Sequence, residues 1–79
     1  MSKYSISFRR DSKSRVGLMM DLDQLPIVAW NALASIQGIN NIQEVNVDEE
    51  QQSVTFSYET EHEGIHFHDF SMHGIEIIS

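Results

Sequence analysis

The residues best suited to chemistry in this 79-residue sequence are its four histidines, which all lie between positions 62 and 73. His66 and His68 alternate with Ile65 and Phe67, and this period of two is typical of a strand. Residues two apart on a strand point to the same side, with Cα atoms about 6.5–7 Å apart. Two imidazoles at that spacing can share one metal ion, so His66 and His68 predict a site for zinc, nickel or copper. Five nearby side chains could complete the coordination shell: Glu61, His62, Glu63, Asp69 and His73. The other interpretation is that the histidines are polar positions of a half-exposed strand and hold no cofactor.

Charge is distributed unevenly along the chain. The formal net charge is −7, from 5 basic and 12 acidic residues. Every Lys and Arg lies in the first fifteen positions, and Asp11 is the only acidic residue there, so residues 16–79 carry negative charge alone. Such a surface repels nucleic acid and anionic lipid and attracts a basic partner. The other interpretation is that acidity only keeps a small domain in solution. The candidate partner-binding residues form two acidic groups: Asp48, Glu49 and Glu50, and then Glu59, Glu61 and Glu63.

The basic segment 9–15 could contact phosphate groups, since it holds Arg9, Arg10, Lys13 and Arg15. The nearby aromatic residues, Tyr4 and Phe8, fall on a predicted core face, and the rest of the chain is acidic. We therefore do not expect direct binding of nucleic acid, and an ordinary solvated turn explains the segment.

The composition excludes several classes of protein. There is no cysteine, which excludes disulfides, thiolate zinc sites and iron–sulfur clusters. No glycine-flanked nucleophile or phosphate-binding loop occurs, and so short a chain cannot easily enclose a pocket from water, so we predict that it is not an enzyme. No apolar run reaches the roughly 18 residues of a membrane span, and the first residues lack the apolar core of a signal peptide. We expect a cytoplasmic protein.

Hydrophobic periodicity predicts the elements. Alternation at Tyr4, Ile6 and Phe8, and again from Val16 to Leu22, predicts a β-hairpin over residues 3–22 with the basic residues near its tip. A helix over about 24–37 follows, with Asp23 as its N-cap, Pro26 in its first turn and Gly38 as its C-terminal cap. The core face of that helix is widened by Ile27, Trp30 and Ala34. We therefore predict that Trp30 is buried between helix and sheet.

A second hairpin is predicted over roughly 42–59, followed by one or two strands whose alternation slips at Asp69. The predicted order is ββαβββ. One helix on an antiparallel sheet of four or five strands buries these apolar stripes, so we predict a two-layer α+β fold with residues 1–79 as a single domain.

The stretch from Leu33 to Tyr58, with Gly38-Ile39, Val45-x-Val47 and Val54-x-Phe56-x-Tyr58, resembles the middle of heavy-metal-associated domains. This resemblance covers about a third of the chain and implies a ferredoxin-like βαββαβ arrangement as the alternative fold. The family's metal motif is a pair of cysteines before the first helix. Residues 19–23 read Met-Met-Asp-Leu-Asp in that place, so the resemblance does not extend to metal binding.

The leading functional hypothesis is a non-catalytic acidic protein-binding module. It would regulate or inhibit a basic, nucleic-acid-binding partner by occupying its positive surface, as some small acidic proteins of phages and mobile elements do. Two alternatives stay open at this point. One is a metal-binding module built on the histidines, and the other is a homo-oligomer in which the basic segment of one copy meets the acidic surface of another.

Overall fold

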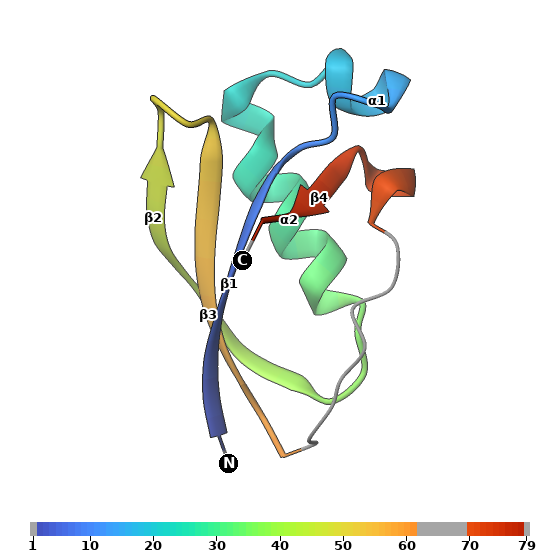
Figure 1. Cartoon of the computed structure of the whole chain (residues 1–79). Coiled ribbons are helices and arrows are strands. Elements are labelled where there is room, and N and C mark those ends of the chain that lie inside the picture. Colours follow the sequence, from blue (N-terminus) through green and yellow to red (C-terminus); the bar gives the residue numbers. More distant parts are fainter. Residues whose placement is uncertain (1, 62–69, 79) are drawn as a thin grey trace.

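The computed structural model describes residues 2–61 and 70–78. A four-stranded antiparallel sheet holds β1 (Ser2–Arg10), β2 (Ile39–Asp48), β3 (Ser53–Thr60) and β4 (Ile75–Ile77) in the order β2-β3-β1-β4. The main helix, α2 (Leu25–Ala34), lies against one face of this sheet (Figure 1). Three short elements complete the described residues: α1 (Arg15–Leu18), η1 (Leu22–Gln24) and η2 (Ser71–His73). The predicted α+β class, with a helix on an antiparallel sheet, is confirmed.

Alternation on the two central strands builds the core face of the sheet. β1 and β3 pair so that Ile6 lies opposite Phe56 and Phe8 opposite Val54, and these four side chains are buried. The intervening positions carry hydroxyls on the other face, where Ser7 and Thr55 are hydrogen bonded at 2.6 Å. The period of two therefore places the apolar side chains toward α2.

The second predicted hairpin is confirmed as β2 and β3. Its turn is closed by Asp48, whose Oδ1 accepts a hydrogen bond from the Gln51 amide at 3.1 Å, and by Gln52, whose φ is +54°. The predicted strand over residues 65–68 and the slip at Asp69 lie outside the described residues. Beyond them, β4 pairs with β1, and Ile75 is fully buried.

The first predicted hairpin is wrong, because residues 16–22 do not form a strand. Ser14 instead caps α1, accepting a hydrogen bond from the Gly17 amide, and the Asp11 carboxylate accepts one from the Lys13 amide at 2.9 Å. These polar side chains satisfy the backbone locally and favour a helical turn over a strand. The partners of β1 are therefore β3 and β4.

A close approach of two glycines holds α1 beside η2 (Figure 1). The Asp11 amide donates a hydrogen bond of 2.9 Å to the carbonyl oxygen of Gly74, whose φ is +78°. A Cβ on Gly17 would overlap the Asp11 carbonyl oxygen and lie 2.7 Å from that of Gly74. Only glycine allows the two backbones to meet here.

The helix is shorter than predicted and begins after a 3-10 turn. Asp23 lies within η1 and is not the N-cap, while Pro26 does lie in the first turn of α2. At the other end the Ser35 hydroxyl donates to the carbonyl oxygen of Ala32 at 2.7 Å, and the helix ends at Ala34. Gly38, with a φ of +94°, lies in the turn that leads to β2. The core side of α2 is fully buried: Leu25, Ala29, Ala32 and Leu33.

The prediction that Trp30 is buried is wrong. Trp30 is 45% exposed, and Ile27, three residues earlier on the same side of α2, is 65% exposed. The sheet covers only the side of α2 that carries Leu25, Ala29 and Leu33. A second apolar side of the helix therefore faces away from the core.

Candidate functional site

The exposed side of α2 opens onto a cleft between the helix and the edge strand β2. This cleft has a volume of about 270 Å³, and we call it the Trp30 cleft. Buried Phe56 of β3 contributes to its lining. Glu44, which lies opposite Phe56 in the sheet register, is the only charged lining residue in the part of the chain that the structure describes. The lining residues are Pro26, Ile27, Trp30, Asn31, Glu44 and Phe56. An apolar cleft with an exposed tryptophan beside it suits a partner's apolar side chain.

A second cleft adjoins the first, because Ile27 lines both. It has a volume of about 540 Å³ and lies between α1, the start of α2 and η2; we call it the Met19 cleft. The Met19 side chain is 77% exposed beside buried Met20. The lining residues are Val16, Met19, Met20, Gln24, Ile27, Val28 and His73. The two clefts form one continuous surface, which we call the apolar track.

The close contact between Gly17 and Gly74 positions the second cleft. It brings α1 against η2, so that Val16 of α1 and Met19, which directly follows α1, line the same cleft as His73 of η2. The His73 ring also lies beside Phe70, with ring centroids 6.5 Å apart. The Met19 cleft thus depends on a contact between segments more than fifty residues apart in the sequence.

Acidic residues lie in or next to the segments that line the apolar track. Asp21 and Asp23 precede α2 and are exposed, and Glu44 faces the Trp30 cleft from β2. Residues 16–79 contain no Lys or Arg, so no cation of the chain's own lies beside these carboxylates in the sequence. On the other side of the Met19 cleft, Arg15 adjoins Val16, and Arg10 donates a hydrogen bond to the carbonyl oxygen of Met20. Carboxylates at the border of an apolar surface favour a partner with basic groups.

The structure separates the two predicted acidic groups. Glu49 and Glu50 are exposed in the turn between β2 and β3. Glu59 is half-buried near the far end of β3, where it accepts a hydrogen bond from Asn41, and exposed Glu61 follows it. Glu59 lies six positions along β3 from Ser53, which is at the turn, a distance of roughly 20 Å. Asp48 closes the turn, and Glu63 lies outside the described residues, so the described acidic residues do not form one surface.

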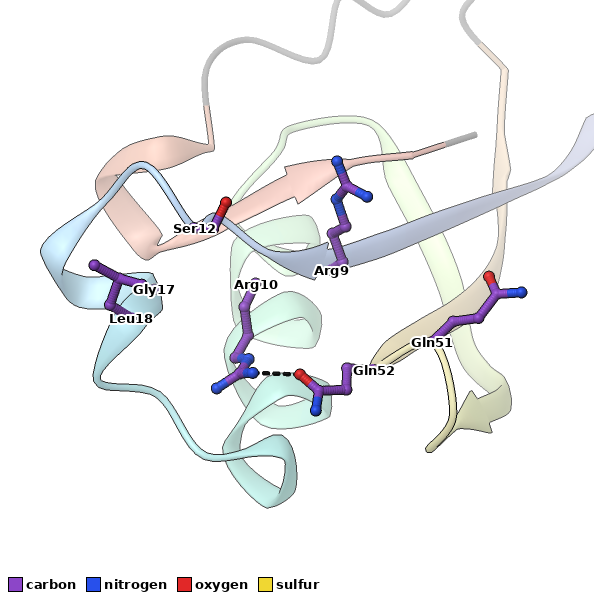
Figure 2. Close-up of a pocket in the computed structure, with 7 residues that line it drawn as sticks. All are labelled: Arg9, Arg10, Ser12, Gly17, Leu18, Gln51 and Gln52. Atoms are coloured by element: carbon purple, nitrogen blue, oxygen red, sulfur yellow. Dashed lines mark hydrogen bonds between the residues drawn. The ribbon is translucent and has the colours of Figure 1, made fainter.

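Arg9 and Arg10 of the basic segment point to opposite sides of β1 (Figure 2). Arg9 forms an ion pair with Glu76 of β4. Arg10 donates hydrogen bonds to the carbonyl oxygen of Met20, at 2.8 Å, and to the side chain of Gln52. Both lie beside a pocket of about 280 Å³ between α1 and the β2–β3 turn, whose lining residues are Arg9, Arg10, Ser12, Gly17, Leu18, Gln51 and Gln52. Because the two guanidinium groups diverge and have protein partners, they do not form a clamp for one phosphate.

The proposed metal ligands His66 and His68 lie outside the described residues. Within residues 2–61 and 70–78, no group of three or more His, Asp or Glu side chains is arranged to hold a metal ion. Among the helices in that part of the chain, none has the length and apolar character needed to cross a membrane.

Comparison with known proteins finds no family, no curated protein and no solved structure that matches this chain.

Proposed function

We propose that this protein is a non-catalytic protein-binding module whose apolar track binds a partner with a basic surface and so regulates or inhibits that partner. The observation that carries the proposal is the exposure of Ile27 and Trp30 beside an apolar cleft, whose only charged lining residue among those described is Glu44. Folding leaves these apolar side chains in contact with water, and binding removes them from it.

Trp30 is the expected anchor of the interface. Tryptophan is enriched among residues that dominate binding energy, particularly where a large side chain lies beside a cleft that excludes water once it is occupied. The carboxylates of Asp21, Asp23 and Glu44 would then meet Lys and Arg of the partner, and they supply selectivity and fast association more than affinity. A partner whose basic surface is covered in this way loses access to other anionic ligands, which is a direct route to inhibition.

We further infer that the fold is a variant of the ferredoxin-like arrangement. The strand order β2-β3-β1-β4, with antiparallel neighbours and α2 connecting β1 to β2, supports this inference. Between β3 and β4 the described residues contribute only η2. In such an arrangement the Trp30 cleft lies at the side of the domain, where α2 meets the edge strand β2.

The test compares two exposed aromatic residues. The immobilised protein, its Trp30→Ala variant and a matched Tyr4→Ala variant are each exposed to extract from the native host; Tyr4 is 42% exposed on β1 and lines neither cleft. We expect a basic protein to be retained by the wild type and by Tyr4→Ala, to be lost from Trp30→Ala, and to bind more weakly as salt increases. Equal retention by Trp30→Ala, with circular dichroism showing that the variant is folded, would refute the proposal.

A further inference from the structure

We propose that the segment of the partner that occupies the apolar track is an amphipathic α-helix with Lys and Arg beside its apolar stripe. This inference rests on the proposed function and names the form that the partner takes. It follows from the shape of the track, from the edge of the sheet beside it, and from the charges around it.

The shape favours a helix because the track is longer than one side chain requires. The Met19 cleft and the Trp30 cleft are separate hollows joined at Ile27, so they form two sockets on either side of one exposed side chain. An amphipathic helix presents apolar residues at positions i, i+3, i+4 and i+7 along one side, which supplies one anchor for each socket. Methionine side chains adapt to varied apolar partners, and Met19 and Met20 line the larger socket.

The edge of the sheet disfavours the main alternative, a partner that adds a strand. β2 is the edge strand beside the Trp30 cleft, and its pairing with β3 shifts register twice, between Asn40 and Gln43 and between Glu44 and Asn46. Such bulges disturb the row of backbone groups that an added strand would pair with. The opposite edge, β4, has only three residues. A helix satisfies its own backbone hydrogen bonds and needs only side-chain contacts.

The charges determine which amphipathic helix fits. Asp21 and Asp23 lie at the start of α2, and Glu44 lies on β2 across the Trp30 cleft. Glu44 lines the Trp30 cleft, and α2 itself carries no charge. Asp21 and Asp23 are the chain neighbours of Met20 and Gln24, which line the Met19 cleft. A helix with Lys and Arg beside its apolar stripe would place cations near these carboxylates. An acidic helix would instead be repelled.

The test uses synthetic peptides of about 18 residues, a length at which a helix can form, added to the full chain. One peptide places leucine at the helical period among lysines, a second has the same composition in strict alternation, and a third replaces lysine by glutamate. Fluorescence of Trp30, the only tryptophan, reports binding, and circular dichroism reports peptide helicity. We expect the helical-period lysine peptide to bind at least about tenfold more tightly than the other two and to gain helicity. Equal or tighter binding of the alternating peptide, or binding without a gain in helicity, would overturn the inference.

Two methionines provide matched variants. Met19 and Met72 are both 77% exposed, but only Met19 lines the track. We expect Met19→Gln to weaken binding of the helical peptide about tenfold and Met72→Gln to leave it unchanged. Only the first substitution removes an apolar side chain that the bound peptide would cover. Equal effects would overturn the inference. If the peptides fail while Trp30→Ala still abolishes retention of the natural partner, the helical form is wrong and the proposed function stands; if Trp30→Ala also has no effect, both fail.

Discussion

Substitutions on the buried side of α2 should lower stability, whereas substitutions on its exposed side should lower partner binding. Leu33 is fully buried against the sheet, and truncation of a buried leucine to alanine costs about 2–5 kcal/mol. A chain of 79 residues has a total unfolding free energy of about 4–12 kcal/mol, so Leu33→Ala should remove a large part of it. Ile27 is 65% exposed, so only about a third of its surface is buried. Ile27→Ala should therefore cost only about 1 kcal/mol of stability.

Urea denaturation followed by far-ultraviolet circular dichroism measures both costs without using Trp30 as the probe. At urea concentrations where both variants are folded, we expect Ile27→Ala to lose partner binding and Leu33→Ala to keep it. The reasoning is refuted if Ile27→Ala destabilises the protein as much as Leu33→Ala, because Ile27 would then be a core residue, or if the two variants bind equally well.

Three further predictions test individual contacts. Burial raises the pKa of Tyr58 above its ordinary value of 10.0, with a smaller contribution from Tyr4. The unfolding free energy should therefore be steady below about pH 10 and fall as pH rises through the raised pKa. Tyr58→Phe should remove that fall, and an alkaline stability profile that the substitution leaves unchanged would contradict the assignment. Gly17→Ala should lower stability by about 1–3 kcal/mol, because its Cβ would overlap backbone atoms, and a neutral effect in denaturation would show that the segment can shift. Arg10→Lys should cost about 1–2 kcal/mol of stability, because a lysine ammonium cannot donate to the Met20 carbonyl and the Gln52 side chain with the geometry of the guanidinium. An unchanged unfolding midpoint would show that these two hydrogen bonds contribute nothing.

The elements that the sequence predicted correctly are those whose hydrophobic periodicity reflects which of their sides is buried. β1 and β3 alternate because one face of each strand packs its apolar side chains against α2, and α2 shows the helical period because one of its sides lies on the sheet. The same alternation from Val16 to Leu22 was misleading. Val16 and Leu18 are exposed, and the conformation there depends on the Ser14 cap and on the contact between Gly17 and Gly74. That contact joins distant segments, so no local pattern records it.

The candidate site was only partly visible in the sequence. The apolar residues of α2 occupy more than one of its sides, but which side the sheet covers is a tertiary property. Trp30 was therefore placed in the core although it lies beside an open cleft. The acidic residues were correctly recognised as a charge bias. Their separation along β3 follows from strand length and pairing, which composition does not contain.

The most direct test of the central claim is a residue-by-residue map of amide chemical shifts as the retained basic partner is added to the protein. Binding at the apolar track predicts that the largest changes lie at Met19, Ile27 and Trp30. It also predicts that the turn carrying Glu49 and Glu50 changes little. Changes concentrated at that turn, with α2 unaffected, would contradict the account and place the interaction on the acidic hairpin end.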